Sequence, residues 1–347
     1  MKSKILLIFL TFFLISCEKK VEKQGKYEVE ISERIKYSDD NQEFKFTSGK
    51  FEYRIPKSDL PFEKILILNA SLVGYVSELG AEGKISGVSS PEYIFSSKIL
   101  NRLVEGKIQN VGNEQKYDIE KIIELQPDAV FTNYVQTFEN TYDLIRSAGI
   151  PVIFIDEYLE QDPLKKASII RLFGHLLGLE KEAEDKFNLI KNKYTQLKDS
   201  VSLNEKPIVL SNEMYGNQWF MAGGNTYVAR YIQDAGGAYI LKDNSDISAV
   251  PMTFEEVYVK AEKATIWVNA GNHSSKASLL NSNPNYGRLS VIKNGRIYGV
   301  NGRIKDKAND FFEQGVVRAD LVLKDYITIF SDNKDGKKKL TFLKELH

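Results

Sequence analysis

The sequence predicts an α/β fold made of two lobes with mainly parallel sheets, joined by one long α-helix. Two observations lead to this prediction. Apolar strand patterns alternate with helical patterns twice, first after Lys64 and again after Pro207, and such alternation is typical of a parallel sheet. Between the two series lies one amphipathic stretch without proline or glycine, from Leu179 to Glu205. We therefore expect two similar lobes with a helix between them.

The first lobe is expected over residues 61–178. Ile65-Leu66-Ile67-Leu68 is a short and fully apolar run, which is typical of a buried strand. Ser71 is expected to cap the helix that follows, and Asp118 to cap a later helix that ends before Pro127. Ala129-Val130-Phe131 then reads as the next strand, so strand and helix alternate through the whole segment.

The second lobe, expected over residues 206–330, repeats this order. Ile208-Val209-Leu210 is a strand pattern, Asn225 is expected to cap the next helix, and Thr253 the one after it. A last helix is expected from Asp310 to Phe330. The matched order of caps and strands predicts that the two lobes are structural repeats.

The segment 179–205 is predicted to form the inter-lobe helix. Its apolar side chains recur every three or four residues, which places them on one face of a helix. A helix of about 20 residues spans roughly 30 Å, enough to lie along two lobes. The alternative is a core helix that belongs to one lobe. The residues of the apolar face are Ala183, Phe187, Ile190, Tyr194, Leu197 and Val201.

The amino terminus resembles a bacterial lipoprotein signal. Residues 1–16 carry Lys2 and Lys4, then an apolar stretch too short to span a bilayer, and Cys17 follows directly as the only cysteine of the chain. A signal of this kind implies a lipid on the Cys17 thiol, which would anchor the protein outside the cytoplasm to a bacterial membrane, on its periplasmic or its cell-surface face. The alternative is an ordinary secretory signal followed by an unrelated cysteine.

Both ends of the chain are expected to lie outside the lobes. Residues 17–60 are interpreted as a lipidated tether and an N-terminal extension, in which alternating residues such as Phe44-Lys45-Phe46 predict one or two edge strands. Residues 331–347 are interpreted as a mobile basic tail.

Composition argues against several classes of function. The 347 residues include 47 basic and 47 acidic side chains, so no net field favours nucleic acid. The three histidines, His175, His273 and His347, are far apart in sequence, whereas proteins that capture bare zinc or manganese use a cluster. No motif of a hydrolase, zinc protease or dinucleotide-binding enzyme occurs. We expect no metal site, no cofactor and no catalytic activity.

Several strings resemble a known family. They include Leu125-Gln126-Pro127-Asp128-Ala129 in the first lobe, and Ala222-Gly223-Gly224-Asn225-Thr226 with Asp234-Ala235-Gly236-Gly237 in the second. They are similar to the extracytoplasmic solute-binding proteins of ABC importers for iron siderophores, haem and cobalamin. The resemblance covers residues 64–330. It implies two Rossmann-like lobes joined by a stiff helix, with the ligand between them.

Glu120 and Glu255 occupy equivalent places, each two residues after a predicted cap. By the resemblance, these positions carry the glutamates that dock on arginines of the permease, one from each lobe. The alternative is that each carboxylate only complements the dipole of its own helix, which contributes about 0.3–1 kcal/mol.

Ligand contacts are expected from loops at the carboxyl ends of the strands, where an open α/β sheet leaves a crevice. Aromatic and amide side chains there suit a large ligand with polar edges, and an arginine could pair with an anionic chelate. Ordinary packing remains the alternative for each aromatic residue, and a surface salt bridge for the arginine. The candidates are Tyr93, Tyr117, Tyr134, Tyr215, Trp219, Phe220, Asn272 and Arg303.

The sequence thus predicts a monomeric, membrane-anchored substrate-binding protein that captures a metal chelate and delivers it to the permease and ATPase subunits of an ABC importer. A ferric siderophore or another iron complex is the leading candidate, with haem included. Cobalamin capture by the same architecture stays open, as does a surface binding or adhesion lipoprotein that takes no part in transport.

Overall fold

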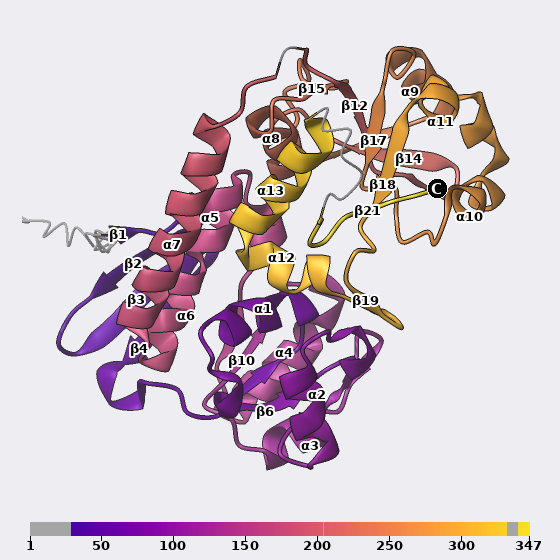
Figure 1. The fold of residues 1–347 in the computed structure, drawn as a ribbon. Helices are drawn as coiled ribbons and strands as arrows, with labels where there is room; N and C mark the ends of the chain where they lie inside the picture. Colours follow the sequence, from indigo (N-terminus) through magenta and orange to yellow (C-terminus); the bar gives the residue numbers. More distant parts are fainter. Residues whose placement is uncertain (1–28, 204, 332–338) are drawn as a thin grey trace, which may run out of the picture.

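The computed structural model describes residues 29–203, 205–331 and 339–347, which form the two α/β lobes shown in Figure 1. Helix α7 (Glu180–Asp199) runs beside both lobes. The predicted signal peptide, Cys17 and the start of the tether lie outside the described residues. Within the described ranges, no helix has the length and apolar character needed to cross a lipid bilayer.

The sheet of the N-terminal lobe has five parallel strands in the order β11-β10-β5-β6-β7. Its central strand is β5 (Ile65–Ile67), all three residues of which are buried, so the apolar run predicted as a strand is confirmed. The other strands are β6 (Ile85–Val88), β7 (Gln109–Asn110), β10 (Ala129–Thr132) and β11 (Val152–Phe154).

The helices of this lobe begin close to the predicted positions. The side chain of Asp118 accepts a hydrogen bond from the backbone N–H of Lys121 and caps α3, as predicted. Helix α1 is capped by Asn69 rather than by Ser71, whose N–H donates to the Asn69 side chain. The helices are α1 (Ala70–Glu78), α2 (Ser97–Val104), α3 (Ile119–Glu124) and α4 (Glu139–Ser147), and a short hairpin of β8 (Gly112–Asn113) and β9 (Lys116–Tyr117) precedes α3.

Helix α7 joins the lobes, as predicted, although it ends at Asp199 before the expected boundary. On one side it packs on α6 (Ile170–Leu177), which follows α5 (Pro163–Ser168). On the other side it packs on α13 (Ala319–Phe330) of the C-terminal lobe. Tyr194 of α7 also donates a 2.8 Å hydrogen bond to Asp234 in that lobe. Because α7 contacts both lobes, the alternative of a core helix within one lobe does not hold.

The sheet of the C-terminal lobe has the order β15-β12-β17-β18-β21, in which only β21 is antiparallel to its neighbour. Its strands are β12 (Ile208–Ser211), β15 (Ala238–Tyr239), β17 (Ile266–Val268), β18 (Arg296–Gly299) and β21 (Lys344–Glu345). A small antiparallel sheet, β13-β14-β16, follows β12, with bounds Met214–Tyr215, Gln218–Ala222 and Ala249–Met252.

The helices of the C-terminal lobe differ from the prediction in two places. Thr226, not Asn225, caps α8. The single helix expected from Asp310 to Phe330 is divided, because Arg318 leaves the helical conformation with a ψ of 61°. The helices are α8 (Tyr227–Asp234), α9 (Phe254–Lys260), α10 (Lys276–Ser282), α11 (Ser290–Asn294), α12 (Gln314–Val317) and α13, and the hairpin before α12 consists of β19 (Ile304–Lys305) and β20 (Ala308–Asn309).

The N-terminal extension contains more structure than the one or two edge strands predicted. It forms a separate antiparallel sheet in the order β1-β2-β3-β4, visible at the left of Figure 1. Phe44 and Phe46, on one face of β3, are fully buried. The strands are β1 (Val29–Glu30), β2 (Ile35–Asp39), β3 (Glu43–Ser48) and β4 (Phe51–Pro56).

The prediction of a mobile basic tail is wrong for residues 339–347. Phe342, Leu343 and Leu346 are buried, and β21 pairs with β18. The carboxylate of Asp325 accepts hydrogen bonds from three consecutive backbone N–H groups, those of residues 341–343. Apolar burial and these bonds fix the segment at the sheet edge.

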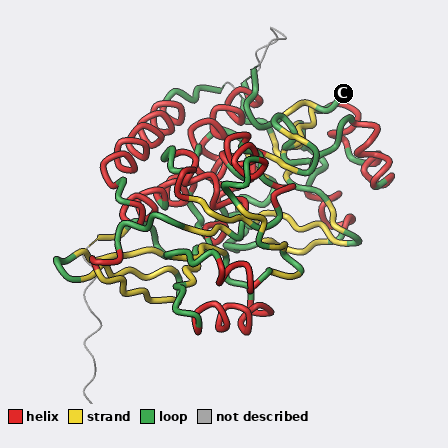
Figure 2. Tube along the Cα trace, turned by 90° about the horizontal axis from the view of Figure 1, so that it is seen from below, coloured by secondary structure: helices red, strands yellow, loops and turns green. Residues whose placement is uncertain are grey.

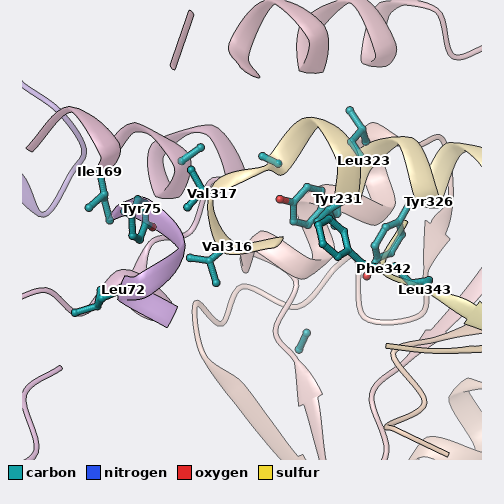
Figure 3. Close-up of a cluster of buried hydrophobic side chains, with 14 of the residues drawn as sticks. Leu72, Tyr75, Ile169, Tyr231, Val316, Val317, Leu323, Tyr326, Phe342 and Leu343 are labelled. Carbon is teal, nitrogen blue, oxygen red and sulfur yellow. The ribbon is translucent and has the colours of Figure 1, made fainter. Parts of the chain in front are cut away.

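The two lobes share one continuous hydrophobic core. Figure 3 shows Val316 and Val317 of α12 between Tyr75 of α1 on one side and Tyr231 of α8 on the other. The contact between α1 and the segment before α12 is close: a Cβ on Gly74 would lie 2.1 Å from the backbone oxygen of Glu313. The view from below in Figure 2 likewise shows a single mass of helices and strands rather than two separated bodies. This shared core limits how far the lobes can move apart.

Candidate ligand-binding cleft

Amide side chains organise the carboxyl edge of the N-terminal sheet. Asn133, which follows β10, is nine-tenths buried and receives a hydrogen bond from the Asn69 side chain at the end of β5. Its own amide donates to the Ile155 carbonyl at 2.6 Å and to the Glu157 carboxylate at 2.8 Å. These bonds tie the ends of three strands together and place Tyr134 at the edge of the sheet, since the Tyr134 N–H donates to Asp156 at 2.8 Å.

The matching edge of the C-terminal sheet is also held by polar side chains. His273, after β17, contacts the Glu213 carboxylate at 2.7 Å, and the Asn301 amide donates to the His273 carbonyl at 2.6 Å. The amide of Asn309 donates to the Asn272 side chain and to the Val300 carbonyl, both at 2.8 Å. The loops after β12, β17 and β18 therefore form one connected, pre-organised surface.

The two edges touch at one end of the cleft. The Glu313 carboxylate, before α12, accepts the backbone N–H groups of Phe95 and Ser96 at 2.5 and 3.0 Å. Arg303 and Lys305 of the β19–β20 hairpin lie 5.2 and 4.3 Å from the centre of the Phe95 ring. Burial raises the pKa of Glu313 to about 7. This end of the cleft is closed by direct contact between the lobes.

A hollow of about 370 Å³ lies between the lobes elsewhere. Asp162 and Lys165, at the start of α5, face Thr226 and Arg230 of α8 across it, and Glu33 of the N-terminal extension completes its wall. Within the described residues, no carboxylate lies within ion-pair distance of Arg230. The hollow is polar and open, so it is accessible to a solute.

Four of the predicted aromatic ligand residues are accessible. Tyr93 and Phe220 are 44% and 40% exposed and Tyr215 is 83% exposed, while Tyr134 is half-buried at the sheet edge. Their contact with a ligand stays a prediction. Asn272 is exposed too, but its side-chain oxygen is already bonded to Asn309.

Trp219 was predicted to contact the ligand, and this prediction is wrong. Its side chain is fully buried and packs 5.4 Å from the rings of both Trp267 and Tyr286, with its indole N–H donating to the Ser211 carbonyl at 3.2 Å. The sequence held a signal for this: in β14, Trp219 and Met221 point inward and alternate with exposed neighbours. The period of two marks a strand with one buried face.

Tyr117 and Arg303 are also engaged by the protein itself. Tyr117 is buried, its ring lies 5.1 Å from that of Phe138, and burial raises its pKa. Arg303 forms a 3.0 Å salt bridge with Asp310, which is 1% exposed. Tyr117 therefore follows the alternative of ordinary packing, and Arg303 that of a salt bridge.

Glu120 and Glu255 lie at matching positions in the two lobes. Each is the second residue of its helix, α3 or α9, and each side chain is exposed. The side chain of Glu255 is 74% exposed and approaches Arg288 only at 3.9 Å. The prediction that each glutamate follows its cap by two residues is confirmed.

The comparison with protein families matches residues 65–303, more than half of the chain, to the periplasmic binding protein model. This chain belongs to the periplasmic binding protein family. The match begins at β5, includes α7 and extends into the C-terminal lobe as far as β18. It leaves out the N-terminal sheet and the segments of the C-terminal lobe from β19 onward. Members of this family are binding proteins, which is the class that the sequence predicted.

Among the relatives of this periplasmic binding protein is an uncharacterized lipoprotein of Methanocaldococcus jannaschii, 24% identical over 82% of this chain and 69% of the relative. A cobalamin-binding protein of Halobacterium salinarum is 26% identical over 71% of this chain and 64% of its own length. A periplasmic haem-binding protein of Pseudomonas aeruginosa has a similar fold, with a TM-score of 0.59 at 17% identity, covering 82% of this chain and 98% of that one.

Proposed function

We propose that this chain is the membrane-anchored substrate-binding protein of an ABC importer, and that it captures a metal chelate between its lobes and delivers it to the permease. The observation that carries the proposal is the family match, which includes residues of both lobes and the helix that joins them. The polar carboxyl edges support it, because amide networks fix side chains before a ligand arrives and so reduce the entropy lost on binding. A ferric siderophore or another iron complex, haem included, is the proposed ligand.

Titration of the full-length chain in detergent with a panel of chelates tests this proposal. The panel holds ferric complexes of a hydroxamate, a catecholate and a carboxylate siderophore, together with haem and cyanocobalamin. We expect saturable binding of one class at one site per chain. A chain that binds no member saturably would contradict the proposal and favour a surface adhesion lipoprotein.

Cobalamin is the second candidate, and the name of the Halobacterium salinarum relative favours it. A corrinoid is large and carries amide groups on its rim, which suits the amide-rich edges of both sheets. In the same titration, binding of cyanocobalamin without binding of any ferric complex would select this candidate.

We further propose that Glu120 and Glu255 dock on the permease. Each carboxylate stands exposed in the first turn of its helix, one on each lobe, so two partner cations could be engaged together. Combining Glu120→Ala with Glu255→Ala is expected to abolish uptake in cells and to leave chelate affinity unchanged. The matched control is Glu124→Ala with Glu262→Ala, which removes an exposed carboxylate at the last residue of α3 and another two residues after the end of α9. Normal uptake by the first variant would show that these glutamates act only on their own helices.

The anchor is proposed to be a lipid on Cys17. The apolar stretch before Cys17 is too short to span a bilayer. The relative from Methanocaldococcus jannaschii is named a lipoprotein, which supports the proposal. In cells, Cys17→Ser is expected to move the protein from the membrane to the soluble fraction and to remove labelling by a fatty acid. Retention of the variant in the membrane fraction would refute the lipid anchor.

A further inference from the structure

The N-terminal sheet lies beyond the part of the chain that matches the family, yet it is fixed to the cleft edge of the N-terminal lobe. The Phe51 ring lies 4.6 Å from the Phe154 ring and 5.0 Å from the Tyr134 ring. The Tyr53 hydroxyl accepts the N–H of Phe154 at 2.7 Å. Phe154 ends β11 and Tyr134 follows β10, so the turn between β3 and β4 is held at the carboxyl ends of these two strands.

A pocket of about 460 Å³ opens at this turn. The N-terminal sheet supplies Arg34, Lys50 and Phe51 to its wall, and the lobe supplies Tyr134, Asp156 and Tyr158. Glu33 lines both this pocket and the hollow between the lobes, so the two spaces are neighbours. The extension therefore adds a further wall beside the inter-lobe cleft.

Two cations of this wall lack a carboxylate partner. Within the described residues, neither Arg34 nor Lys50 forms an ion pair with a carboxylate. The Lys50 ammonium lies 4.2 Å from the centre of the Tyr134 ring, where it is held over an aromatic face. A Cβ on Gly49 would lie 2.6 Å from the Arg34 guanidinium, so Arg34 rests against the same turn.

The acidic groups of the pocket leave these cations available. Asp156 accepts the N–H of Tyr134, and its pKa is raised by burial while Arg34 and Lys50 lower it. Glu33 is exposed at the rim, where solvent screens its charge. Since the cations stand beside aromatic rings, the wall suits a ligand that joins an anionic group to a large apolar or ring surface.

We propose that Lys50 and Arg34 of the N-terminal sheet bind a carboxylate of the chelate, with Tyr134 and Phe51 packing against its body. This inference rests on the proposed function and narrows its substrate to metal chelates with peripheral carboxylates. Haem, with two propionates, and a ferric complex of a carboxylate siderophore both have this chemistry. Cyanocobalamin is neutral and ferrioxamine B is a cation, so they lack it.

The test is to titrate these four probes into the full-length chain and into Lys50→Met, Arg34→Met and the double variant. We expect haem or the ferric carboxylate complex to bind more tightly than the other two probes. Each single substitution should weaken that binding about tenfold, because a charge-assisted hydrogen bond is lost. Added salt should weaken binding to the wild type more than to the double variant.

Lys36→Met is the matched control, because Lys36 lies on the same sheet, is exposed and does not line the pocket. It should bind the probe as the wild type does, and thermal unfolding of each variant checks that the fold is kept. Unchanged affinity in the Lys50 and Arg34 variants, or tighter binding of cyanocobalamin or ferrioxamine B, would overturn this inference and leave the proposed function standing. Failure of the wild type to bind any probe, those of the wider panel included, would contradict the proposed function itself.

Discussion

The two lobes repeat one order of strands and helices, but they differ in which aromatic rings at their cleft edges are buried and which are exposed. In the N-terminal lobe, the Tyr134 ring lies half-buried at the edge, with Phe51 beside it and Lys50 over it. In the C-terminal lobe, Trp219 points into the core, and Tyr215 and Phe220 of the same hairpin point out. A position near the carboxyl edge of a sheet therefore does not by itself make a ring accessible. Successive side chains of a strand point to opposite faces, so the position of the residue along the strand decides whether its ring is buried or exposed.

The inward ring of the C-terminal lobe should matter most for stability. Replacing Trp219 by Ala removes a fully buried side chain between Trp267 and Tyr286, which should lower the free energy of unfolding by about 3–5 kcal/mol. Tyr215→Ala, on the exposed face of the same hairpin, should change it by less than about 0.5 kcal/mol. Urea unfolding of both variants measures the difference. Similar values for the two would mean that Trp219 does not face the core.

The next effect concerns the contact that joins the lobes. The pKa of Glu313 is about 7 in the folded chain and 4.5 is its ordinary value, because burial disfavours the carboxylate. The nearby Asp310 charge raises this pKa further, while Lys305 and the N–H groups of Phe95 and Ser96 lower it. The folded state thus binds the proton more tightly than the unfolded state does. The protonated Glu313 carboxyl therefore stabilises the folded state at low pH, and this contribution is lost as the pH rises from about 4.5 to about 7.

This loss amounts to roughly 3 kcal/mol at 1.36 kcal/mol per pKa unit. Glu313→Gln removes the titrating group, so the variant should not lose this stability. The free energy of unfolding of the variant minus that of the wild type should therefore increase by roughly 3 kcal/mol between pH 4.5 and 8. Urea unfolding at a series of pH values measures it. A constant difference between the two proteins across this range would show that Glu313 is ionised and solvated rather than buried between the lobes.

A smaller effect contrasts how each lobe holds an end of the chain. The C-terminal lobe holds residues 341–343 through the Asp325 carboxylate, whereas the N-terminal lobe holds its extension through buried apolar side chains and several hydrogen bonds, that of the Tyr53 hydroxyl among them. Asp325→Ala leaves three N–H groups without that acceptor and should lower the free energy of unfolding by about 2 kcal/mol. Hydrogen exchange at residues 341–345 should also become faster. Lys344→Ala, an exposed change in β21, is the control and should alter neither quantity.

The smallest effect is expected at the caps of α3 and α9, the helices that carry Glu120 and Glu255. Asp118 caps α3 through one hydrogen bond, whereas Thr253 and Glu256 form a reciprocal capping box at α9. Asp118→Ala and Thr253→Ala should each lower the free energy of unfolding by about 1 kcal/mol, with the larger loss at Thr253. Thermal unfolding of the two variants compares them. A much larger loss at Asp118 would be inconsistent with parallel roles in the two lobes.

The sequence predicted the parts of the fold that depend on local patterns. The apolar run at β5 and the helical periodicity of α7 each lie within one element, so periodicity alone indicates them. The repeated caps before α3 and α9 also predicted that Glu120 and Glu255 are equivalent, because each glutamate follows its cap by two residues.

The errors arose where contacts distant in sequence decide the structure. The lysine-rich stretch before Leu340 suggested a solvated tail, but Phe342 and Leu343 find their partners at β18 and Asp325. The same holds for the N-terminal sheet, because its packing on Phe154 and Tyr134 joins residues about a hundred positions apart. For Trp219, the alternation of buried and exposed positions in β14 indicates an inward-facing ring. The polar residues of the neighbouring turn led instead to the prediction that Trp219 lies in an exposed loop.

A chelate held between the lobes should protect backbone amides of both, and hydrogen exchange with and without a saturating member of the panel tests this most directly. We expect slower exchange on both sides of the cleft, after β10 at residues 133–135 and in the β13–β14 hairpin at residues 215–218. Exchange at the β3–β4 turn should slow as well. Protection confined to one lobe, or none at these segments despite saturation, would contradict binding between the lobes.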